Sequence, residues 1–147
     1  MVRNTKRVNQ NHIFVDTNVL IGAYSGDKRF LEDKACIHYL TSLVGKKIYI
    51  STLSVAQLVA TLQKRMSCDE LIKVVKELRH RFEVLSFTKD DIDKSIVDVG
   101  ADLEDNMQHI ISMKGSCRVI ITKNTRDYNV YPDVYAITPD RVRNIPR

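Results

Sequence analysis

The sequence has few of the residues that build disulfide frameworks, zinc sites or flexible linkers. Tryptophan is absent, and the 147 residues include only three prolines, five glycines and three cysteines. Cys36, Cys68 and Cys117 are widely spaced, odd in number and form no CxxC pair, which indicates reduced thiols. No repeat, low-complexity tract or Pro/Gly-rich linker divides the chain, so a single domain is expected.

Three further absences narrow the class of protein. The four histidines form neither an HxH nor an HxxxH pair, which argues against a zinc hydrolase. Residues 1–11 are polar and basic without a following apolar stretch, so they do not resemble a signal peptide. No apolar run approaches the roughly 18–20 residues needed to cross a membrane. We expect a cytoplasmic protein with a flexible basic arm at 1–11 and one domain at 12–147.

Positive charge exceeds negative charge. The 23 Lys and Arg residues outnumber the 18 Asp and Glu residues, which gives a net charge of +5. These basic residues are spread along the chain and form no single cluster. A surplus of this size is compatible with nucleic-acid binding and equally with an ordinary solvated surface.

Short apolar runs alternate with amphipathic segments along the chain. Strands are expected at 12–15, 47–51, 82–85, 118–122 and 134–137. Helices are expected at 18–24, 30–44, from Thr52 or Ser54 to about 62, at 70–80, 88–100 and 102–114, and briefly after Pro139. This alternation predicts one α/β domain with a mostly parallel sheet, whose ligands bind outside the carboxyl ends of the strands.

Acidic residues occur where the expected strands end or a helix begins. Asp16 ends the first strand, and Asp102 and Asp105 open a helix. Asn124 and Asp127 follow the strand at 118–122. Packed carboxylates raise one another's pKa unless a cation binds between them, and Mg²⁺ and Mn²⁺ prefer oxygen ligands. In a basic chain this constellation predicts a metal site that acts on a phosphodiester.

Each of these acids also has a purely structural explanation. Asp102 suits the N-cap of its helix, and the helix dipole favours Asp105 in the first turn. Asp16 can cap the first helix, and Asp127 can be a turn residue. The helix after Asp102 is expected to bury an apolar stripe and to point Asp105 along the sheet edge. That stripe consists of Leu103, Met107, Ile110 and Ile111.

Four segments resemble the PIN domain family. They are FVDTNVLI at 14–21, DLEDNMQ at 102–108, VIITKNTRDY at 119–128 and AITPDRV at 136–142. Each motif is short, but their order and spacing are specific and extend over roughly residues 12–143. The resemblance implies a five-strand parallel sheet flanked by helices, and a metal-dependent endoribonuclease that hydrolyses RNA.

The resemblance also implies partners and site residues. In bacteria such stand-alone domains are commonly toxins of type II toxin–antitoxin pairs, inhibited by a small antitoxin. Carried over, the catalytic residues are Asp16, Asp102, Asp105, Asp127 and Asn124, and the same four aspartates would bind Mg²⁺ or Mn²⁺. Substrate contacts are expected from Asn18, Gln57, Lys123 and Arg126, and outer contacts from Arg29, Lys46, Lys47 and Lys64. A homodimer is expected through the helices at 30–44 and 54–80.

One position departs from the family pattern. The helix after the second strand usually carries Glu where this chain has Gln57, which supplies no negative charge. Some bacterial branches lack this Glu and carry the extra carboxylate that Asp102 resembles. The alternative is a weakened or inactive PIN domain that binds RNA or protein. A phosphatase or response-regulator-like domain with Asp16 as nucleophile is disfavoured, because no Asp-x-Asp follows the first strand.

Overall fold

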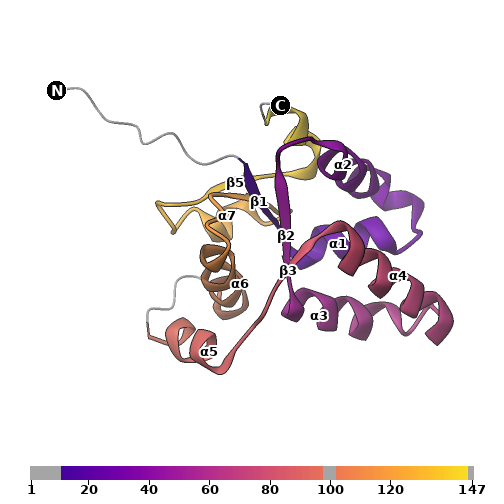
Figure 1. The fold of residues 1–147 in the computed structure, drawn as a ribbon, viewed down its shortest axis with the longest axis horizontal. Coiled ribbons are helices and arrows are strands. Elements are labelled where there is room, and N and C mark those ends of the chain that lie inside the picture. The colour runs from indigo at the N-terminus through magenta and orange to yellow at the C-terminus, as the bar shows by residue number, and fades with distance from the viewer. Residues whose placement is uncertain (1–10, 98–101, 146–147) are drawn as a thin grey trace.

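A computed structural model of the chain describes residues 11–97 and 102–145. The expected arm therefore lies outside the described residues except for Asn11, as does Gly100, the expected end of the helix at 88–100. The expected five-strand parallel sheet is confirmed, with strand order β3-β2-β1-β4-β5 (Figure 1). The strands are His12–Val15 (β1), Lys47–Ser51 (β2), Glu83–Leu85 (β3), Val119–Ile121 (β4) and Tyr135–Ile137 (β5).

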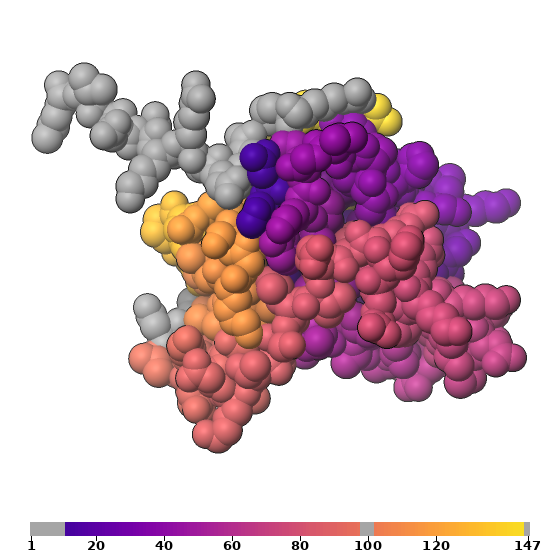
Figure 2. All heavy atoms as spheres, viewed as in Figure 1, coloured from indigo at the N-terminus to yellow at the C-terminus, as the bar shows by residue number. Residues whose placement is uncertain are grey.

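Helices connect the strands and cover both faces of the sheet. They are Thr17–Tyr24 (α1), Leu31–Ser42 (α2), Thr52–Leu62 (α3), Cys68–Arg81 (α4), Lys89–Ser95 (α5), Leu103–Lys114 (α6) and Thr125–Tyr128 (α7), with 3-10 turns at Lys28–Phe30 (η1) and Pro139–Asn144 (η2). Figure 1 shows α1–α4 on one side of the strands and α5–α7 on the other. In the space-filling view α5 projects from the body of the domain, where it packs against α6 (Figure 2).

The strands are short, and the central strands β1 and β4 are buried on both faces, which explains why these two are nearly continuous apolar runs. In β1, Ile13 and Val15 join the larger core under α1–α4, whereas Phe14 joins a smaller core with Ile111 and Tyr128. Successive strand side chains point to opposite faces, so one apolar run serves both cores. Full burial of one such side chain contributes about 1.5–3 kcal/mol.

The strand order places the carboxyl end of the central strand, β1, where a ligand is expected to bind. β1 lies between β2 and β4, and the chain reverses its direction of winding there. Ligands of open α/β sheets bind outside the carboxyl ends of the strands at such a switch point. The residues that follow β1 and β4 therefore flank the expected binding crevice.

One local expectation, the cap of the helix at about 52–62, needs correction. The N-cap of α3 is Ser51, whose hydroxyl accepts a hydrogen bond from the Ser54 backbone N–H at 2.9 Å. The expected residues, Thr52 or Ser54, do not fill that position.

In the described parts of the chain, none of the helices combines the length and apolar character that a membrane span requires.

We predict that Gly22→Ala destabilises the fold, although alanine is the better helix former. A Cβ at Gly22 would lie 1.8 Å from Oδ2 of Asp33, a buried residue of α2 that packs against α1. Overpacking of this kind costs about 1–3 kcal/mol, which urea unfolding measures directly. The double variant with Asp33→Ala should be more stable than the sum of the two single changes implies. A Gly22→Ala protein as stable as the wild type would contradict the prediction.

Candidate active site

A pocket of about 380 Å³ lies at the carboxyl edge of the sheet, between α1, α3 and α6. Its lining residues are Asp16, Thr17, Asn18, Ile21, Gln57, Ala60, Thr61, Glu104, Asp105 and Asn124. Segments from the whole length of the chain thus meet around three carboxylates. A larger pocket of about 540 Å³ lies along β5 and η2, but Asp140 is the one carboxylate in its lining, so it lacks this constellation.

Asp16 is held rigidly between β1 and β4. Its Oδ1 accepts a hydrogen bond from the Thr17 backbone N–H, and its Oδ2 accepts one from the Thr122 hydroxyl, each at 2.8 Å. Its own backbone N–H donates to the Ile121 carbonyl at 2.9 Å. Burial raises the pKa of Asp16, and the hydrogen bonds from Thr122 and Thr17 oppose that shift. Asp16 therefore also caps α1, as the structural explanation expected.

Asp105 lies on the buried side of α6, which is mainly polar. The expected apolar stripe is wrong: Leu103 is 42% exposed, and only Ile111 of the four stripe residues is buried. The buried residues of α6 are Asp105, Asn106, Gln108, Ile111 and Ser112. Because the first turns of α6 face the polar carboxyl edge of the sheet, the helix turns its acid and amides inward. Asp105 is therefore only 8% exposed.

The pKa of Asp105 is raised from 3.8 to about 7. Burial is the largest cause, followed by the negative charge of Asp16 and by interactions with Asp127 and Asp102. The structure thus brings all four predicted aspartates into electrostatic contact around Asp105. A cation in the pocket would stabilise the ionised form of this residue.

Asp102 and Asp127 flank Asp105 but do not line the pocket. The Asp102 Oδ1 accepts a hydrogen bond from the Asp105 backbone N–H at 3.0 Å, so Asp102 is the N-cap of α6. Asp127 lies in α7, a four-residue helix where the sequence indicated only a turn. Both carboxylates raise the pKa of Asp105, so their negative charge reaches the pocket from its rim.

Two residues near Asp16 were missed by the sequence analysis. Glu104 lines the pocket, and its charge contributes to the raised pKa of Asp16. Tyr128 is fully buried, and its hydroxyl oxygen has no hydrogen bond of good geometry within the described residues. It lies close enough to lower the pKa of Asp16, while burial raises the pKa of Tyr128 itself. The sequence offered no signal for Tyr128 beyond its place directly after Asp127.

The neutral residues predicted to contact substrate lie in the pocket, and the basic ones lie outside it. Asn18 and Gln57 belong to the lining, as does Asn124, which was predicted to be catalytic. Lys123 instead forms an ion pair with Asp33, at 2.5 Å between Nζ and Oδ2, and its ammonium lies 4.3 Å from the centre of the Phe30 ring. The Arg126 side chain is exposed on α7.

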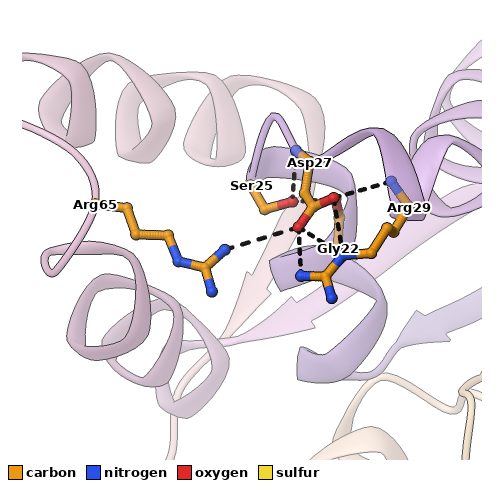
Figure 3. A network of polar contacts seen from close by, with 5 residues as sticks. All are labelled: Gly22, Ser25, Asp27, Arg29 and Arg65. Carbon is orange, nitrogen blue, oxygen red and sulfur yellow. Dashed lines mark hydrogen bonds and ion pairs between the residues drawn. The ribbon is translucent and has the colours of Figure 1, made fainter.

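An arginine pair lies near the outer ends of α1 and α3. Asp27 accepts hydrogen bonds from the Arg29 guanidinium, the shortest at 2.7 Å, and lies 3.9 Å from Arg65 (Figure 3). The hydrogen bonds from Arg29 lower the pKa of Asp27 to about 2. Ser25 braces this loop by donating to the Gly22 carbonyl and accepting from the Asp27 backbone N–H. Arg29, one of the expected outer contacts, is thus held in place by its neighbour.

The donor set suits a hard divalent cation. Within the described ranges 11–97 and 102–145, no three His, Cys, Asp or Glu side chains converge closely enough to enclose an ion unaided. Mg²⁺ is usually bound through one or two carboxylates, with waters and phosphate oxygens completing its octahedron. Asp16 and Asp105 both line the pocket and have raised pKa values, so they fit that mode of binding.

We predict that Asp105→Asn stabilises the metal-free protein at alkaline pH. The folded-state pKa of Asp105, about 7, exceeds its ordinary 3.8, so ionisation should reduce wild-type stability progressively across that range. Asparagine cannot ionise and avoids this loss. Urea unfolding in EDTA should show a larger advantage of the variant at about pH 8 than at about pH 5. Asp140→Asn, an exposed control, should show no such difference. An equal advantage of Asp105→Asn at both pH values would contradict the prediction.

Comparison with known proteins relates the chain that carries this pocket to a protein family. A family model described as PIN domain matches residues 12–126. Ribonuclease VapC1 of Aquifex aeolicus is 24% identical over 141 residues, which cover 90% of this chain and 94% of that protein.

Three solved structures share the fold. A toxin–antitoxin complex from Klebsiella pneumoniae has a TM-score of 0.62 at 20% identity, covering 86% of this chain and 97% of that one. VapBC2 from Rickettsia felis, bound to a DNA fragment from their promoter, has a TM-score of 0.59 at 14% identity, covering 86% and 98%. VapC20 of Mycobacterium tuberculosis, a sarcin–ricin-loop-cleaving toxin, has a TM-score of 0.57 at 15% identity, covering 74% and 86%. With the family model spanning most of the domain, the chain belongs to the PIN domain family.

Proposed function

We propose that this chain is a divalent-metal-dependent endoribonuclease, the cytoplasmic toxin of a type II toxin–antitoxin pair. The observation that carries the proposal is the convergence of Asp16 and Asp105 in one pocket at the switch point of a PIN fold. The naming of VapC1 as a ribonuclease and of a structural neighbour as an RNA-loop-cleaving toxin supports this function.

The side chains of the pocket have separate roles in the proposed reaction. A bound Mg²⁺ or Mn²⁺ supplies Lewis-acid polarisation of the phosphoryl group and a more acidic water. Asp16 and Asp105 hold that cation, and Asp102 and Asp127 strengthen the negative potential that attracts it. Asn18 and Asn124 lie on the wall of the same pocket, where their amides can orient a phosphate.

The ion pair of Lys123 gives this residue a different role from the expected one. Its ammonium is committed to Asp33, while its backbone N–H donates to the Asn18 Oδ1 at 3.3 Å. Lys123 therefore fixes the loop after β4 against α2 and α1. Arg126, which is exposed on the neighbouring α7, is the better candidate for contact with the RNA backbone.

A second candidate function is that of a PIN domain which binds RNA or protein without cleaving. It is favoured by Gln57, because this residue leaves the pocket one carboxylate short of the usual family set. The retention of Asp16, Asp102, Asp105 and Asp127 favours the nuclease.

Cleavage should depend on metal and on Asp105. Purified protein is incubated with a pool of structured RNAs in EDTA, Mg²⁺ or Mn²⁺, and cleavage sites are mapped by primer extension. We expect cuts only with metal, and a loss of at least about 100-fold in Asp105→Asn, because that change removes a proposed ligand. Asp140→Asn should cleave like the wild type. Well-folded wild-type protein that binds RNA but never cuts it would support the second candidate.

The assembly proposed for the toxin is a homodimer that binds a small antitoxin. The helices α2 and α4 expose Leu31 and Ile72, apolar side chains suited to an interface. The toxin–antitoxin assemblies among the structural neighbours support the antitoxin partner.

Light scattering of the isolated protein should give about twice the chain mass of 16.9 kDa at micromolar concentration. Replacing both Leu31 and Ile72 by Lys should shift the population to the monomer, because the apolar contact would be lost. A monomeric mass for the wild type would contradict the homodimer and leave the proposed chemistry untouched.

A further inference from the structure

A cluster of hydroxyl and amide groups lies beneath the pocket and connects four elements of the fold. Thr17 begins α1, Ser51 ends β2, Ser54 and Gln57 lie in α3, and Gln108 lies in α6. We call these five residues the hydroxyl–amide cluster. Ser51, Ser54 and Gln108 are completely buried, and Thr17 is nearly so. Gln57 is its half-buried end, where the cluster reaches the pocket.

Gln108 makes three hydrogen bonds within the cluster. Its Nε2 donates to the Thr17 Oγ1 and to the Ser54 Oγ, each at 3.0 Å. Its Oε1 accepts from the Ser51 hydroxyl at 2.9 Å. Both amide hydrogens and one oxygen lone pair of this buried side chain are therefore used.

The number of hydrogen-bond donors in the cluster determines the orientation of the Gln108 amide. If the Gln108 amide were turned over, its nitrogen would face only Ser51, and one buried N–H would have no acceptor in the cluster. Such a group loses its hydrogen bond to water without replacement, so the first orientation is the stable one. Thr17 then accepts from Gln108, and its Oγ1 also lies 2.7 Å from the Ser54 Oγ. With Ser54 as the donor of that contact, the single Thr17 hydrogen is available for Gln57. The Thr17 hydroxyl donates that hydrogen to the Gln57 Oε1 at 2.7 Å.

The orientation of Gln57 follows from this chain of donors. Its Oε1 is engaged by Thr17 at the base of the pocket, which leaves the amide nitrogen, with two N–H groups, as its free functional group. We infer that Gln57 is an oxyanion-binding residue, whose amide N–H groups donate to a non-bridging oxygen of an RNA backbone phosphate. Gln108 is the positioning residue that holds it. The inference rests on the proposed ribonuclease function.

This role is electrostatically opposite to that of the Glu that is usual at this position. A glutamate would add a fourth carboxylate to a pocket already lined by Asp16, Glu104 and Asp105. An additional negative charge would favour a cation and repel a phosphate. The Gln57 amide has no charge, and with its Oε1 engaged by Thr17 it offers donors to the pocket that it lines, so it favours the substrate over the metal.

RNA binding in EDTA tests the inference, because metal and cleavage are then absent. Fluorescence anisotropy with a labelled single-stranded RNA is measured for the wild type, Gln57→Leu, Gln57→Glu and Gln63→Glu. Gln63 is exposed at the end of the same helix, and six residues place it about 240° around the axis from Gln57. Gln63→Glu is therefore matched in charge and helix but directed away from the pocket.

We expect Gln57→Leu to weaken binding about tenfold, as for a lost hydrogen bond to a charged group. Gln57→Glu should weaken it further, and Gln63→Glu by less than about threefold. Thr17→Val, which removes the hydroxyl that orients Gln57, should also weaken binding. Thr41→Val removes a hydroxyl that bonds only backbone carbonyls of α2, and should not. Thermal melts in the same buffer show that each variant is folded.

The outcomes separate this inference from the proposed function. Unchanged RNA affinity in folded Gln57→Leu overturns the inference, even if the wild type cleaves RNA with Mg²⁺. A loss of Mn²⁺ affinity in Gln57→Leu by calorimetry, with RNA affinity in EDTA unchanged, overturns it in favour of a metal ligand. If Gln57→Leu loses RNA affinity but the wild type never cleaves, the inference stands and the nuclease proposal fails.

Discussion

Repulsion between carboxylates at one edge of the sheet is the constraint on which the organisation of this domain depends. Asp16 and Asp105 are both buried, and burial raises the pKa of each. The negative charge of Glu104 adds to the shift of Asp16, and the negative charge of Asp16 adds to the shift of Asp105. Isolated groups of this kind would separate or remain protonated. The fold prevents separation through elements that are themselves firmly held. Asp16 accepts hydrogen bonds from Thr17 at the start of α1 and from Thr122 directly after β4, while Asp102 caps the helix that carries Asp105.

The side chains beneath the carboxylates are neutral and hydrogen-bond to one another. The hydroxyl–amide cluster fixes the starts of α1 and α3 to the middle of α6, without adding charge beneath the carboxylates. On the other side, Gly22 permits Asp33 to approach α1, and Asp33 pairs with Lys123 after β4. Amides and hydroxyls thus support the acidic pocket on one side, and an ion pair with the buried carboxylate of Asp33 supports it on the other.

The fold was predictable because its central strands, β1 and β4, are buried on both faces and therefore appear as apolar runs. The second strand was predicted at 47–51 and is observed as Lys47–Ser51; the fourth was predicted at 118–122 and is observed as Val119–Ile121. Parallel pairing followed from the alternation with helices, whereas the strand order came from the structure. The meeting of Asp16, Asp105 and Asn124 followed because parallel strands end at one edge. The roles of these residues in catalysis stay a proposal.

Other features depended on tertiary neighbours that no local pattern records. Helical periodicity identified an apolar stripe in α6, but it could not show that the facing surface was polar, so Leu103 was assigned wrongly to the core. Lys123 pairs with Asp33, 90 positions away in the sequence, and α7 is too short to have a period. Gln108 looked like any polar residue of a helix until its four-element environment was visible.

The hydrogen bond between Thr122 and Asp16 has a consequence for synthesis of the chain. It joins residues 106 positions apart, and Asp105 and Asn124 also come from the last third of the sequence. A nascent chain that has emerged only as far as α5 contains β1 but has no β4 to pair with it and no α6 to close the pocket. Non-local pairing of this kind forms late in folding. The pocket can therefore assemble only after the last third of the chain has emerged, and chains truncated before α6 have no assembled site.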